Sequence, residues 1–183
     1  METFKKLVNG IRRLSDFDIL FLKNYDFYYN NILEAEKITM ETGYDDNYDK
    51  AVCDNMICHN NLKKDNILLT PQDDVYILNF SGARVDYYTQ DLADFIYRYI
   101  KNQPENRLNV DVIIEAYSEE KPVTDDDIKI LYGCLLFPGA FLKASRLYYN
   151  KKRSWAPSSV INRMEQVLSC KDIFHEYISN IWV

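Results

Sequence analysis

The chain has 183 residues, 47% of them hydrophobic and 27% charged, so we expect a folded globular protein and exclude disorder as its main state. Its formal net charge of −6 argues against nonspecific binding to DNA or RNA, and we predict no nucleic-acid partner. The longest apolar run, Ile130 to Leu142, is short and is interrupted by Gly133, Pro138 and Gly139, so we predict no membrane span.

The cysteines are too few for a disulfide scaffold, and no two of them show the C-x-x-C spacing of a zinc site; they are Cys53, Cys58, Cys134 and Cys170. His59 and His175 are the two histidines that could join them as metal ligands. We therefore predict no metal site, and synthesis in a reducing cytoplasm.

Two helices are predicted before residue 43. Apolar residues recur at helical spacing from Phe4 to Leu14, which indicates a first helix. Ser15 and Asp16 then form a helix-start signal. The apolar pattern continues from Phe17 to about Thr42 and predicts a long, mostly buried helix that ends at Gly43. Residues 45–49 are predicted to be a polar connection.

Residues 56–81 are predicted to form a loop and a β-hairpin. Met56 and Ile57 form a short strand that enters a loop at His59. The apolar segments 67–69 and 76–78 are typical of two strands joined by the turn at residues 70–74. Lys63 and Lys64 lie at the tip of the loop, where they either attract a phosphate or an acidic partner or are simply solvated.

The second half of the chain is predicted to be helical. A helix from Leu92 to Ile100 follows a cap at residues 89–91 and stops before Pro104. The next helix is predicted from Val110 to Tyr117. The residues expected on its inward face are Val112, Ile113, Ala116 and Tyr117.

Thr124 and Asp127 form a capping-box pattern for a helix that continues to Leu136, and Pro138 breaks or kinks it. The remaining helices are predicted at 141–149, 160–168 and 173–178, and the basic residues 151–153 follow the first of them. Because no linker or repeat divides the chain, we predict a single domain over residues 1–183. Its class is mainly α with a small β-hairpin, or α+β.

One motif carries the chemistry. His59, Asn61 and Asn66 follow the pattern His-x-Asn-x-x-x-x-Asn, and an apolar segment then ends in Asn79-Phe80-Ser81. This resembles the phosphotransferase frame His-x-Asp-x-x-x-x-Asn followed by Asp-Phe-Gly or Asp-Phe-Asp. In that frame the first Asp orients the acceptor hydroxyl and takes its proton, while the Asn and the second Asp hold magnesium on the nucleotide phosphates.

Further segments resemble the C-terminal lobe of the aminoglycoside phosphotransferase and choline-kinase group, and more closely the CotS-type spore coat proteins. They are Cys58-His59, Asn66-Ile67-Leu68, Tyr76-Ile77, Phe80, Gln90-Asp91-Leu92, Glu115-Ala116-Tyr117, Leu131-Tyr132, Leu136-Phe137-Pro138 and the segment from Tyr148 to Trp155. The resemblance implies a protein-kinase-like fold and a place in the spore coat of a spore-forming bacterium. It also implies that no N-terminal β lobe is present, so we expect a truncated protein or half of a split one.

The substitutions at the motif argue against catalysis. An Asn amide cannot accept a proton at neutral pH, so Asn61 marks a degenerate catalytic position. Asn66 and Asn79 are degenerate cofactor-binding positions, because they offer magnesium only neutral carbonyl oxygens. The resemblance implies structural roles for His59 and Asp91. The side chain of Asp65 is expected to point away from Asn66.

Three hypotheses follow. The first is a non-catalytic, kinase-like spore coat protein, a pseudokinase, that needs no cofactor and binds other spore coat proteins or itself. The second is a small-molecule phosphotransferase that uses Mg-ATP and is completed by a separate N-terminal lobe. The third is a pseudokinase that binds a sugar-like or choline-like ligand. In the first and third cases we expect no enzyme activity, and the surface facing the missing lobe is expected to be partly apolar.

Overall fold

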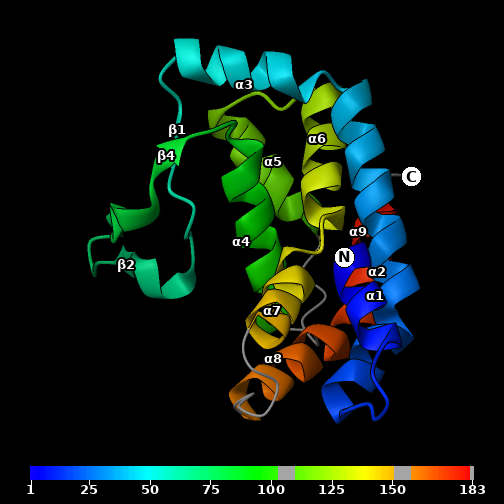
Figure 1. Cartoon of the computed structure of the whole chain (residues 1–183). Coiled ribbons are helices and arrows are strands. Elements are labelled where there is room, and N and C mark those ends of the chain that lie inside the picture. Colours follow the sequence, from blue (N-terminus) through cyan, green and yellow to red (C-terminus); the bar gives the residue numbers. More distant parts are fainter. Residues whose placement is uncertain (103–109, 151–157, 182–183) are drawn as a thin grey trace.

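A computed structural model describes residues 1–102, 110–150 and 158–181. Pro104 and the predicted basic run 151–153 lie outside these residues. The helices, coloured along the chain in Figure 1, are α1 (Glu2–Asn9), α2 (Asp16–Glu41), α3 (Tyr44–Cys53), α4 (Thr89–Asn102), α5 (Val110–Glu120), α6 (Asp125–Leu136), α7 (Gly139–Tyr149), α8 (Ser158–Ser169) and α9 (Lys171–Ile181). The short elements are β1 (Ile57–Cys58), the 3₁₀ turn η1 (Lys64–Asn66), β2 (Ile67–Leu69), β3 (Val75–Ile77), the 3₁₀ turn η2 (Phe80–Gly82) and β4 (Arg84–Val85).

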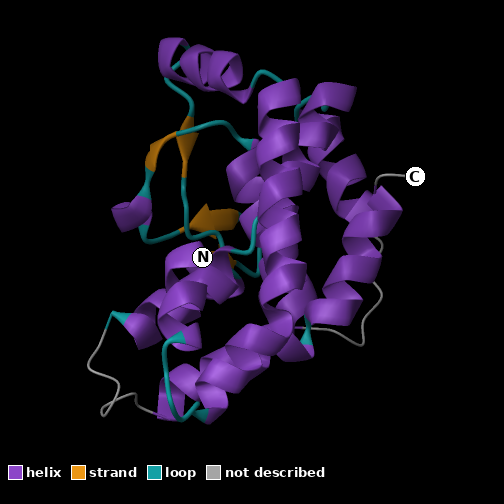
Figure 2. Cartoon of the chain, turned by 45° about the vertical axis from the view of Figure 1, so that its right-hand side comes forward, coloured by secondary structure: helices purple, strands orange, loops and turns teal. Residues whose placement is uncertain are grey.

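The strands form two small antiparallel sheets. In the predicted hairpin, β2 pairs with β3 in the register Ile67 with Ile77 and Leu69 with Val75. The strand β1 pairs with β4, which closes the base of the loop between them. Figure 2 shows both sheets on one side of the helical body. The predicted class, mainly α with a small hairpin, is confirmed.

The long helix α2 connects two apolar clusters. Its N-terminal half contributes Phe17, Phe21, Tyr25 and Tyr28 to a cluster with α7 and α8. Its C-terminal half contributes Ala35 and Ile38 to a second cluster with α4, α6 and α9. Gly133 of α6 allows a close approach there, because a Cβ atom at this position would lie 3.1 Å from Ile38 Cγ2. One helix of 26 residues therefore links both halves of the core.

Both predicted N-terminal helix caps form in the structure. Ser15 accepts a hydrogen bond from the Asp18 amide, and the Asp18 carboxylate accepts one from the Ser15 amide. Thr124 and Asp127 make the same reciprocal pair at the start of α6. Asp127 also accepts a hydrogen bond from the Tyr87 hydroxyl, so this cap is tied to the loop before α4.

Three predictions from the sequence were wrong. Residues 45–49 belong to α3. Its first-turn aspartates interact favourably with the positive end of the helix dipole, and the fully buried Ala51 anchors the helix to the core. The first helix ends at Asn9 rather than Leu14, because Gly10 follows as its C-terminal cap. In α5, Ile113 and Tyr117 pack against the core as predicted, but Val112 and Ala116 are exposed and Val110 is the buried residue, so the inward face was misassigned in part.

Within the described residues, the run Asp125–Tyr149 is long and apolar enough to cross a membrane by length and composition alone. Half of its most apolar window is buried inside the protein. Core helices of soluble proteins pass the same test, so this is weak evidence for a span. The absence of a membrane span stays a prediction.

We predict that Asp127→Asn lowers the free energy of unfolding by about 2 kcal/mol, because the amide accepts through one oxygen only and cannot keep both the hydrogen bond from the Thr124 amide and the one from the Tyr87 hydroxyl. Burial alone would raise the pKa of Asp127, but hydrogen bonds from Tyr87 and Thr124 bring that pKa below its ordinary value. Because the pKa of Asp127 is lower in the folded state than in the unfolded state, its ionised form stabilises the fold. This contribution is fully present at a pH above the unfolded-state pKa and is lost as the pH falls through the folded-state pKa. Urea unfolding from pH 7 to pH 3 measures this difference.

The matched control is Asp126→Asn, at the neighbouring exposed position, where the carboxylate contacts only Lys129 across one helical turn. Its effect is expected to stay within about 0.5 kcal/mol. Equal effects of the two substitutions would show that the buried cap is not the source of the stability.

Candidate functional site

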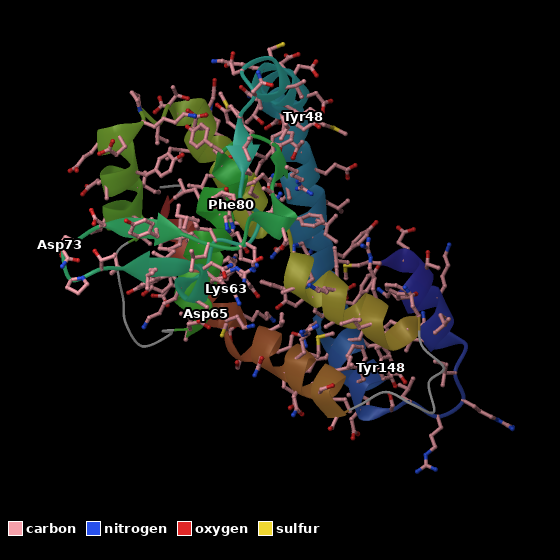
Figure 3. All side chains as sticks on the ribbon, turned by 90° about the vertical axis from the view of Figure 1, so that its left-hand side faces the viewer. Tyr48, Lys63, Asp65, Asp73, Phe80 and Tyr148 are labelled. Atoms are coloured by element: carbon pink, nitrogen blue, oxygen red, sulfur yellow. The ribbon has the colours of Figure 1, made fainter. Side chains whose placement is uncertain are left out.

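The candidate site is the loop between β1 and η1, residues 58–66, together with Asn79 at the end of the hairpin. Figure 3 shows Lys63 and Asp65 on this loop, with Phe80 on the other side of the hairpin base and Asp73 at the hairpin tip. The pairing of β1 with β4 and of β2 with β3 brings residues 61, 66 and 79 into one region. The loop is positioned chiefly by groups on α4 and the hairpin.

Asp91, in the first turn of α4, binds the loop through both oxygens of its carboxylate. Its Oδ2 accepts a hydrogen bond from the His59 amide, and its Oδ1 accepts one from the Asn60 amide at 2.8 Å. Asn60 has a φ of 58°, in the left-handed region that Asn adopts more readily than most residues. The carboxylate thus fixes the sharpest bend of the loop and has no oxygen left without an amide partner.

His59 is buried and joins the loop to the hairpin. Its Nε2 lies 2.8 Å from the Leu78 carbonyl oxygen, and its Nδ1 accepts a hydrogen bond from the Asn61 amide at 3.2 Å. This arrangement requires the tautomer with the proton on Nε2, which then donates to Leu78. The ring also packs edge-on against Phe80. Both ring nitrogens are engaged with the backbone, which leaves neither for proton transfer to a substrate.

The side chain of Asn66 bonds within the loop, whereas that of Asn79 bonds next to the end of the hairpin. Asn66 is buried, and its Nδ2 donates to the Asn61 carbonyl oxygen at 2.8 Å. Asn79 has a φ of 66°, and its Oδ1 accepts a hydrogen bond from the Ser81 hydroxyl at 2.8 Å. Where the phosphotransferase frame has two carboxylates, this site has uncharged amides.

The acidic side chains near the loop do not replace the missing carboxylates. Asp65 is exposed and its Oδ2 pairs with Lys63 Nζ at 3.1 Å, while Asp91 is used by the backbone amides described above. Within the described residues, no group of three His, Cys, Asp or Glu side chains could hold a metal ion.

Cys58 does not supply a nucleophile. Its thiol is buried and donates to the carbonyl oxygens of Asp86 and Tyr87. Burial, together with the nearby carboxylates of Asp91 and Asp86, raises the pKa of this thiol to about 12. The reactive thiolate is therefore scarce at neutral pH.

The hairpin and its base expose large apolar side chains. Each of them is at least 45% exposed, and we call this set the apolar hairpin surface: Ile57, Leu68, Leu69, Val75, Tyr76, Ile77, Leu78 and Phe80. Ile67 of β2 is half-buried, whereas the rest of β2 and all of β3 are exposed, so the helical body gives the two strands little cover.

A groove of about 610 Å³ opens beside the loop. Its cationic side chains come from the loop and from α4, α7 and α8, and we call it the basic groove: Lys63, Lys64, Arg98, Lys101, Lys143 and Arg163. From the sequence, only Lys63 and Lys64 could be singled out. The other cations lie far apart along the chain, and no sequence spacing signals that they share one groove.

Comparisons with known proteins give a family and a similar solved structure. The family model described as "Spore coat putative kinase YutH" matches residues 1–181. The crystal structure of an aminoglycoside phosphotransferase from Alicyclobacillus acidocaldarius subsp. acidocaldarius DSM 446 matches with a TM-score of 0.81 at 16% sequence identity. That match covers 98% of this chain and 53% of the solved chain, so the chain spans about half the length of that protein. Among curated proteins, no match was found.

These matches confirm the resemblance and the kinase-like fold predicted from the sequence. At this identity the solved structure supports the fold alone. The functional roles expected for Asn61, Asn66, Asn79, His59 and Asp91 stay predictions.

We predict that Asp91→Asn loosens the loop without unfolding the protein. The amide group accepts only through its oxygen, so one of the two backbone N–H groups loses its partner at a cost of about 1–3 kcal/mol. Hydrogen–deuterium exchange should speed up at the amides of His59 and Asn60. Asp94→Asn, about one turn further along α4, removes the partly buried pair with Arg98 and leaves the loop contacts in place, so it is the control. Unchanged exchange at residues 59 and 60 would contradict the role of Asp91.

Proposed function

This chain belongs to the family described as "Spore coat putative kinase YutH", and we propose that it is a non-catalytic member that works by binding other coat proteins. Under this proposal the chain is made in the cytoplasm of a spore-forming bacterium and becomes part of the spore coat. It uses the kinase-like fold as a binding scaffold and needs no cofactor.

The proposal is carried by the charge state of the loop. Asn61 and Asn79 are uncharged, and the two nearby carboxylates are committed to other groups: Asp91 to backbone amides and Asp65 to Lys63. A group that could accept a proton from an acceptor hydroxyl is thus missing at position 61. Loss of a general base of this kind typically slows a reaction by about 10²–10⁴-fold.

Magnesium binding would be weakened as well. The ion is usually held by one or two carboxylates together with phosphate oxygens. Here Asn66 uses its amide nitrogen within the loop, and the amide oxygen of Asn79 accepts the Ser81 hydroxyl. Neutral oxygens hold the dication poorly, and its stabilisation of charge is a large part of phosphoryl transfer.

The apolar hairpin surface supports a role in binding proteins. Exposed apolar side chains are common singly, but a contiguous set on a two-stranded edge favours contact with another polypeptide. The fold therefore keeps a rigid, clamped loop and presents beside it a surface suited to a partner.

The same surface supports a second candidate, a phosphotransferase completed by a β-rich lobe from a separate polypeptide. That candidate requires the second lobe to cover the apolar hairpin surface and to bring Mg-ATP to the loop. A choline-like ligand is less well supported, because the basic groove beside the loop would repel a cation.

We predict that the wild-type chain neither binds Mg-ATP at micromolar concentrations in isothermal titration calorimetry nor transfers its phosphate. The variant with Asn61→Asp and Asn79→Asp restores both carboxylates, and we expect at least about tenfold tighter binding of Mg-ATP, because the dication gains anionic ligands.

The charge-matched control is Asn9→Asp with Asn30→Asp, both at exposed positions away from the loop. This control should bind Mg-ATP no better than the wild type. Phosphate transfer by the wild-type chain, alone or with an added β-rich lobe, would refute the non-catalytic role.

A further inference from the structure

The basic groove is strongly positive on a protein of net negative charge. The ion pairs within it join Lys63 to Asp65 at 3.1 Å and Arg98 to Asp94 at 2.8 Å. The other cations that line it have no acidic partner among the described residues; they are Lys64, Lys101, Lys143 and Arg163. The groove therefore has an excess of positive charge that the chain itself does not neutralise, and it fits an anionic ligand.

The opposite charge gathers at the other end of the molecule. Helix α3 and its C-terminal cap expose four aspartates against a single lysine, Lys50; they are Asp45, Asp46, Asp49 and Asp54. We call these four aspartates the acidic end. Helices α3 and α6 meet in a buried cluster, to which α3 contributes Ala51 and α6 contributes Ile130. The exposed Asp125 in the first turn of α6 therefore adds to the negative charge.

The two surfaces lie far apart and cannot meet within one chain. Figure 1 shows α3 at one end of the molecule and α7 and α8 at the other. In Figure 3, Tyr48 of α3 lies well above Lys63 at the edge of the basic groove. Complementary charges at opposite ends of one chain cannot contact each other within that chain, but they favour and orient contact between two molecules.

We infer that the basic groove binds the acidic end of a second copy of this chain, head to tail. Both partners of this contact are visible on one molecule, and this is why a second copy is preferred over an unrelated acidic protein. The inference rests on the proposed role as a coat protein that acts by binding, and it names the partner and the surfaces. Because the contact joins different surfaces of the two copies, it leaves a free groove at one end and a free acidic end at the other. Such a contact extends into an open assembly unless its rotation closes a ring.

The test uses two neutralised variants of the full chain. One carries Lys64→Gln, Lys143→Gln and Arg163→Gln in the groove, and the other carries Asp45→Asn, Asp49→Asn and Asp54→Asn at the acidic end. All six positions are exposed, so the fold should persist, and circular dichroism and thermal melting check that it does. Sedimentation velocity measures the association of each variant and of their mixture.

We expect the wild-type chain to form a range of oligomers at low salt and to dissociate when salt shortens the electrostatic range to about 3 Å near 1 M. Each variant alone should associate at least about tenfold more weakly, because one side of every contact has lost its charge. Their mixture should form a one-to-one complex and nothing larger, since only one intact groove and one intact acidic end remain in each pair.

A wild-type chain that stays monomeric at low salt, or whose oligomers resist both salt and the substitutions, would overturn the head-to-tail contact. Binding of an aspartate-rich peptide by a monomeric wild-type chain would also overturn it, and would assign the groove to another protein. These outcomes can be told apart from a failure of the proposed non-catalytic role. That role would fail if the wild-type chain bound Mg-ATP or transferred its phosphate.

Discussion

The geometry of the site depends on the carboxylate of Asp91. Helix α4 is anchored by buried Leu92, Ala93 and Ile96, so the acid in its first turn is held in a fixed position. From there it accepts both amide N–H groups at the bend of the loop, and charged hydrogen bonds of this kind are stronger than neutral ones. This interaction holds the bend at Asn60, and together with the contacts of the His59 ring to Leu78 and Phe80 it fixes the loop.

The shape of this site and the chemistry of the phosphotransferase frame are supplied by different groups. The shape comes from Asp91, His59 and Asn66, all of which are bonded to the backbone. Catalysis in the phosphotransferase frame depends on charges at positions 61 and 79, where this chain has asparagine. Since Asn is nearly the same size as Asp, the exchange removes charge without disturbing the backbone.

The distribution of exposed groups suits a protein that works through its surface. Apolar side chains gather on the hairpin, positive charge gathers in the groove beside the loop, and negative charge gathers at α3. The apolar surface favours close contact through burial of area, whereas the charged surfaces favour orientation and depend on salt. Because positive and negative charge lie on different surfaces, the charge distribution of the molecule is asymmetric.

The sequence alone determined the features that depend on near neighbours. The helix starts at Ser15 and at Thr124 and the existence of the hairpin are local features, and the structure has them as predicted. Helix α3 was missed because its polar sequence carries little apolar periodicity, and burial of Ala51 against other helices stabilises it. Only the tertiary structure brought Lys143 and Arg163 into one groove with Lys63, because residues far apart in sequence meet through packing of helices rather than through any spacing along the chain.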